Sequence, residues 1–90
     1  GAVRGVSSKT VYVLRRLLKN LEDESVDHGS YSFLSFLCRE LAEVAYSIHE
    51  ELLKRGDEVA AVKVFEQLHV PFLTMADFFE KLSEKREAEQ

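Results

Sequence analysis

Three histidines are the side chains of this 90-residue sequence best suited to metal binding or proton transfer. His49 opens the sequence His-Glu-Glu-Leu-Leu, which begins like the His-Glu-x-x-His motif of zinc proteases. Leu53 occupies the place of the second histidine, so two imidazoles of one helix cannot meet on a metal ion. His28 follows several acids, but these lack the alternate spacing of a calcium loop. The histidines therefore predict no metal site and no cofactor.

Nucleophilic catalysis is not favoured either. Cys38 is the single cysteine and lies beside apolar residues of a helical period, which predicts a buried thiol in a reducing compartment. No serine lies in a Gly-x-Ser-x-Gly sequence, and the four glycines stand alone, which excludes a nucleophile elbow and a glycine-rich phosphate loop. We expect no catalytic residue, and an intracellular protein (cytoplasmic or nuclear) that is not an enzyme.

The longest element is a helix predicted over residues 31–55. Its apolar residues recur at steps of three and four, which places them on one face. They are Leu34, Leu37, Leu41, Val44, Ile48 and Leu52. The opposite stripe is polar and consists of Ser32, Ser35, Arg39, Glu43, Ser47, Glu50 and Lys54. Ser30 is a suitable N-cap, and we expect the other elements to pack against the apolar face.

Two shorter helices are predicted over residues 8–21 and 58–69. Ser7 or Ser8 can cap the first, whose apolar face consists of Val11, Leu14, Leu17, Leu18 and Leu21. Gly56 is suited to end the long helix in a left-handed conformation, and Asp57 to cap the next helix at once. This tight turn predicts that the third helix folds back on the long one.

A fourth helix is predicted over residues 74–86. Pro71 is expected to end the third helix, because the residue before a proline is pushed out of the helical region. Thr74 and Asp77 then have the spacing of a capping box. His69 is expected to lie at the carboxyl end of the third helix, where a cation is favoured. The predicted fold is all-α: a compact four-helix bundle-like domain around the long central helix.

The composition predicts one globular domain, since 46% of the residues are hydrophobic and 31% are charged. No run of 18 apolar residues occurs. We expect a flexible arm at residues 1–7, a helical domain at 8–83 and a charged tail at 84–90. The Gly-Ala start is interpreted as a cloning remnant on a domain taken from a longer protein.

The net charge of −4 is unevenly distributed. Residues 1–20 have five bases and no acid, whereas residues 21–58 have ten acids and three bases. The simplest interpretation is that a basic first helix lies against an acidic middle. The alternative is nucleic-acid binding, with Arg15, Arg16 and Lys19 as phosphate contacts.

The apolar residues of two segments remain as candidate contact sites. Seven of the ten residues in 70–79 are hydrophobic, and the long helix begins with three aromatic residues. The candidate partner-binding residues are Tyr31, Phe33, Phe36, Phe72, Met75, Phe78 and Phe79. Segment 70–79 is alternatively a lid on the core. We expect a non-catalytic protein–protein interaction module, an adaptor or scaffold that binds an amphipathic helix or peptide; homodimerisation is the other alternative.

Overall fold

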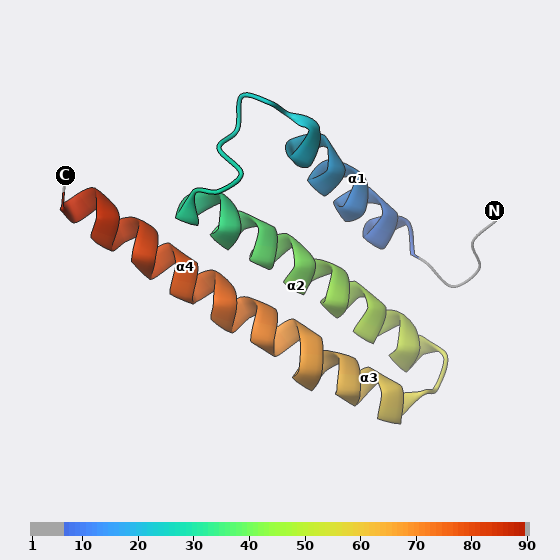
Figure 1. Cartoon of the computed structure of the whole chain (residues 1–90). Helices are drawn as coiled ribbons and strands as arrows, with labels where there is room; N and C mark the ends of the chain where they lie inside the picture. The colour runs from blue at the N-terminus through green and yellow to red at the C-terminus, as the bar shows by residue number, and fades with distance from the viewer. Residues whose placement is uncertain (1–6, 90) are drawn as a thin grey trace.

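Three helical rods lie side by side in the computed structural model, which describes residues 7–89 (Figure 1). The first rod is α1 (Ser8–Glu22) and the second is α2 (Tyr31–Lys54). The third rod is continuous and comprises α3 (Glu58–Val64), the π-helical turn η1 (Phe65–His69) and α4 (Val70–Ala88). The described residues contain no strand, so the predicted all-α fold is confirmed.

The starts of the first three helices are confirmed at the level of their caps. The side-chain oxygens of Ser7, Ser30 and Asp57 each accept a hydrogen bond from a backbone N–H three residues later, at 3.1 Å. Each bond satisfies one of the N–H groups that a helix start leaves without an intrahelical partner. Residues 1–6 of the predicted arm, and residue 90, lie outside the described residues.

The turn after α2 also has the predicted form. Gly56 has a φ of +81°, in the left-handed region that favours glycine. Its N–H donates to the carbonyl of Leu53, and the N–H of Asp57 donates to the carbonyl of Leu52, both at 3.0 Å. This pair of bonds closes the helix end as a Schellman motif. The third rod therefore runs antiparallel to α2 and directly beside it (Figure 1).

The prediction of a helix break at Pro71 is wrong. The third rod stays helical through the proline because η1 widens the preceding turn: the N–H of Val70 donates to the carbonyl of Phe65, five residues back. A regular α-helix would place the proline ring against the carbonyl four residues earlier, and the wider π turn relieves that clash. Thr74 is consequently inside α4, and its hydroxyl donates to the carbonyl of Val70 at 3.1 Å. Residues 84–88, expected in a tail, continue the helix.

The rods form a single flat layer, so the predicted compact four-helix bundle is wrong. The extents are 51 × 27 × 12 Å, so the layer is less than half as thick as it is wide. Among the described residues, α1 contacts α2 but neither α3 nor α4. Because α2 contacts every other element, the prediction that the long helix is central is confirmed.

Many of the side chains buried in the two seams of the layer are small. The buried hydrophobic residues are Val13, Leu17, Phe33, Cys38, Ala42, Ala45, Ala61 and Ala76. Half of them are alanines, whose small side chains allow α2 and the third rod to approach closely. At this approach the Ser35 hydroxyl donates a hydrogen bond to the backbone carbonyl of Ala76 at 2.9 Å. Ser35 and Ser47, predicted on a polar outer stripe, are buried in the seams. The predicted apolar face of α2 is not the buried one.

Polar side chains join α1 to α2. Arg16 Nη2 lies 2.7 Å from Glu40 Oε1 and 3.2 Å from Glu43 Oε2, and the hydroxyls of Thr10 and Ser47 are hydrogen-bonded. The hydrogen bond to the buried Glu40 carboxylate raises the pKa of the Arg16 guanidinium. The expected contact of a basic first helix with acidic residues of the long helix is thus confirmed.

Candidate functional site

The predicted apolar stripe of α2 lies on one broad face of the layer, outside both seams. Glu40 contacts Arg16 of α1, whereas the carbonyl of Ala42 accepts a hydrogen bond from His69 of the third rod. Successive residues of an α-helix are rotated by about 100°. Leu41, between them in the sequence, is therefore turned away from both neighbouring rods. Five residues of the stripe are half-buried and Ile48 is exposed.

Helix α1 adds leucines to the same broad face. Leu17 is buried against α2, and Arg16, one residue earlier, reaches Glu43 on the far side of α2 from Leu41. Leu18, one residue after Leu17, is therefore rotated toward the face that contains Leu41. The residues of α1 on this face are Leu14, Leu18 and Leu21, all exposed.

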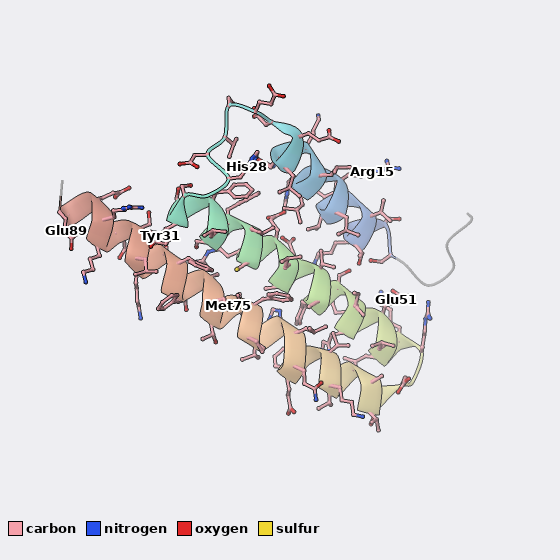
Figure 2. The ribbon with its side chains drawn as sticks, viewed as in Figure 1. Arg15, His28, Tyr31, Glu51, Met75 and Glu89 are labelled. Carbon is pink, nitrogen blue, oxygen red and sulfur yellow. The ribbon has the colours of Figure 1, made fainter. Side chains whose placement is uncertain are left out.

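Helix α4 completes the face on the other side. Ala76 is fully buried against α2, and Asp77 contacts Arg39 on the side of α2 opposite Leu41. Met75, one residue before Ala76, is therefore turned toward the face that contains Leu41; Figure 2 labels Met75 midway along the third rod. We call the whole surface the apolar face: Leu14, Leu18, Leu21, Leu34, Leu37, Leu41, Val44, Ile48, Leu52, Met75, Phe79 and Leu82.

The opposite face of the layer is crossed by ion pairs. Arg39 Nη2 lies 2.5 Å from Glu80 and 3.5 Å from Asp77, which links α2 to α4. Arg16 contacts Glu43 at 3.2 Å, which links α1 to α2 on this side. One broad face is therefore polar and cross-linked by charges, and the other is aliphatic. Scattered single apolar residues are normal on a protein surface, whereas here they are gathered on one side of the layer.

The predicted aromatic site is divided between the two sides of α2. Phe33 is buried against the His28 ring at a centroid distance of 4.9 Å, and Phe36 lies 5.8 Å from Phe33. Phe36 precedes Glu40 by four residues and so shares its α1-facing side. Tyr31 instead stacks on Phe79 of α4 at 6.3 Å, at the end of the layer where Figure 2 labels it. The structure thus brings Tyr31 and Phe79 together but separates them from Phe33 and Phe36.

The remaining predicted contact residues lie along α4. Phe72 and Phe79 are half-buried, whereas Met75 and Phe78 are exposed. The Phe78 and Phe79 rings contact edge to face, with their centroids 5.8 Å apart. Met75 and Phe79 belong to the apolar face. The sequence-based site did not include the leucines of α1 and α2, because their regular period was assigned to the core.

The three residues of the alternative phosphate site differ in their surroundings. Arg15 and Lys19 are exposed on α1. Arg16 is engaged by the carboxylates of Glu40 and Glu43. Two of the three predicted cations therefore remain available to a phosphate.

Two histidines form hydrogen bonds across the seam between α2 and the third rod. His49 Nδ1 lies 2.8 Å from the carbonyl of Ala61, and His69 Nδ1 lies 2.8 Å from the carbonyl of Ala42. A carbonyl only accepts hydrogen bonds, so both Nδ1 atoms are the protonated donors. His69 joins η1 to α2, and the prediction that it caps a helix end is wrong. Within residues 7–89, no three His, Cys, Asp or Glu side chains form a group able to hold a metal ion.

Cys38 precedes Ala42 by about one helical turn and therefore shares the side of α2 that faces the third rod, where its thiol is buried. Burial raises its pKa, because it disfavours the charged thiolate. A thiolate is the nucleophilic form of cysteine, so this environment suits a packing residue.

Comparisons with protein families, curated proteins and solved structures found no match to this chain. No helix among residues 7–89 has the length and apolarity needed to cross a membrane.

Proposed function

We propose that this chain is a non-catalytic protein–protein interaction module whose apolar face packs against apolar helices of another polypeptide. One observation supports this proposal most: the most regular apolar stripe of the central helix lies outside both intramolecular seams. Each fully buried aliphatic side chain contributes roughly 1.5–3 kcal/mol, and the exposed members of this face, among them Leu14, Leu18 and Ile48, leave part of that stabilisation unused. A second helical layer would recover it.

The shape of the surface favours a polypeptide over a small ligand. Small-molecule sites are concave and have a few converging polar groups. The apolar face instead extends across three rods, and its α2 stripe contains no charged residue between Leu34 and Leu52. Partner helices bind such surfaces through side chains spaced at three and four residues. The nucleic-acid alternative has less support, because Arg16 is already paired with two carboxylates.

Two lysine variants of α2 test this proposal. Ile48 lies on the apolar face and is 39% exposed, whereas Leu53 is 46% exposed and five residues further on. Five residues correspond to about 140° of rotation, so the two side chains point to different faces. Both changes put a lysine at an exposed aliphatic position of the same helix, so their effects on folding should be similar.

The assay offers the immobilised chain a library of amphipathic helical peptides, together with the free chain itself. We expect bound polypeptides to be lost from Ile48→Lys and retained by Leu53→Lys, while the helical circular dichroism of both variants stays unchanged. Polypeptides that bind the two variants equally would show that the apolar face is not the binding site.

A further inference from the structure

We infer that the polypeptide covering the apolar face is a second copy of this chain, so that two layers stack face to face in a symmetric dimer. This inference rests on the proposed function, because it names the occupant of the same face. Stable domains consist of at least two packed layers around one core, and this chain supplies one layer.

The size of the missing layer matches the chain itself. The radius of gyration is 15.3 Å, whereas a compact domain of 90 residues has about 12 Å and one of 180 residues about 16 Å. A second layer packs at about 8–10 Å from the first, so stacking would bring the 12 Å thickness close to the 27 Å width. Two copies therefore form a body of ordinary proportions, which a single short peptide would not.

The layer is large enough for a dimer interface. The rectangle that encloses it measures 51 × 27 Å, or roughly 1,400 Å². An apolar face covering somewhat more than half of this rectangle would provide the roughly 800 Å² per partner of a standard interface. Obligate interfaces are also more hydrophobic, like a domain core cut in half. The leucines, valine and isoleucine of the α2 stripe have this composition.

In a two-fold symmetric dimer, the middle of α2 would pack against the middle of α2 in the second copy. Two flat layers overlap most fully when their centres coincide, and α2 is the middle rod of the layer. In a two-fold dimer the same patch meets its own copy, so like charges near the axis would repel. Leu41 and Val44 lie closest to the middle of Tyr31–Lys54 on the apolar face and are uncharged. This surface is compatible with its own copy.

Sedimentation equilibrium of the whole chain, from about 1 to about 200 µM, gives the first test. We expect twice the monomer mass of 10.3 kDa for the unmodified chain and for Leu53→Lys. Ile48→Lys should raise the dissociation constant about 100-fold or more, because each dimer would bury two unpaired ammonium groups. Circular dichroism checks that each variant is folded.

Cysteine cross-linking supports the test if Ile48→Lys fails to fold. Leu41→Cys should form a disulfide-linked dimer under mild oxidation, at a rate at least about tenfold above that of Glu50→Cys on the opposite stripe. Equal rates for the two variants would overturn the inference.

A monomer of 10.3 kDa at every concentration would also overturn it, as would a dimer that persists when folded Ile48→Lys is used. The proposed function is separable from this inference. If the chain is monomeric but still loses peptide capture on Ile48→Lys, the apolar face serves another partner, and only the identity of the occupant is wrong. If neither association nor capture depends on Ile48, both proposals fail.

Discussion

Replacing Leu17 by alanine should release α1 from the layer while α2 and the third rod stay packed. Within one chain, and among the described residues, α1 contacts only α2, so its place in the layer depends on one intramolecular seam. Val13 and Leu17 are 1% and 6% exposed and are the buried apolar side chains that α1 contributes to that seam. The α2–α4 seam has its own buried residues, including Cys38 and Ala76, and none of them belongs to α1.

The expected cost of Leu17→Ala is comparable with the stabilisation that the buried apolar side chains of α1 give to this seam. Fully burying Val13 and Leu17 contributes roughly 1.5–3 kcal/mol each, or about 3–6 kcal/mol together. A buried Leu→Ala substitution costs about 2–5 kcal/mol, which includes the cavity it leaves. Leu17→Ala should therefore open α1 at least about 30-fold more often, since each 1.4 kcal/mol corresponds to a factor of ten.

Hydrogen exchange with mass spectrometry, at one fixed protein concentration, measures this opening helix by helix. Amides of α1 should exchange at least about 30-fold faster, while those of α2 and α4 keep their protection. Lys19→Ala, an exposed position of the same helix, is the control and should leave exchange nearly unchanged. Equal loss of protection in all helices would show that the layer opens as one unit and that α1 does not open separately.

Three further substitutions test local features. Pro71→Ala should change the free energy of unfolding by less than about 1 kcal/mol in urea titration, because η1 already removes the clash; a gain near 3 kcal/mol would contradict this. Gly56→Ala should cost about 1–2 kcal/mol in the same titration, since φ is +81° and no neighbour lies within 4 Å of the added carbon; Gly56→Asn should cost less. The pKa of the Cys38 thiol is raised in the folded chain. Its contribution to the free energy of unfolding should therefore be fully present below the ordinary thiol pKa of 9.0. That contribution should fall as the pH rises past 9.0, because the thiol then ionises in the unfolded chain but not yet in the folded one. Cys38→Ala should remove that part of the fall.

Local chemistry was predictable wherever one residue decides a backbone conformation. Ser30 and Asp57 cap helices because their side-chain oxygens accept hydrogen bonds from backbone N–H groups of the first turn. Gly56 ends α2 because a residue without a side chain adopts the left-handed conformation easily. The prediction at Pro71 was wrong because the clash between a proline ring and the preceding helical turn can be relieved in two ways. The chain can break, or it can insert a π turn, and the packing of both α3 and α4 on α2 favours continuity.

The position of the core was less predictable. Periodicity identifies the residues that share a helical face, but it does not identify what covers that face. The stripe containing Leu41 was assigned to the core because it is the most apolar, whereas the seams use small or polar residues such as Ser35 and Ala42. The aromatic residues that begin α2, outside this stripe, were the sequence feature that indicated contacts on more than one side of the helix.

The sequential arrangement of the rods has a consequence for folding kinetics. Every contact between rods among the described residues joins rods that follow one another along the chain, first α1 with α2 and then α2 with the third rod (Figure 1). Such a topology has a low contact order, and low contact order is associated with folding in microseconds to milliseconds. During synthesis the α1–α2 hairpin can form before the third rod is complete. We therefore expect the layer to assemble in chain order, faster than any association that depends on the encounter of two chains.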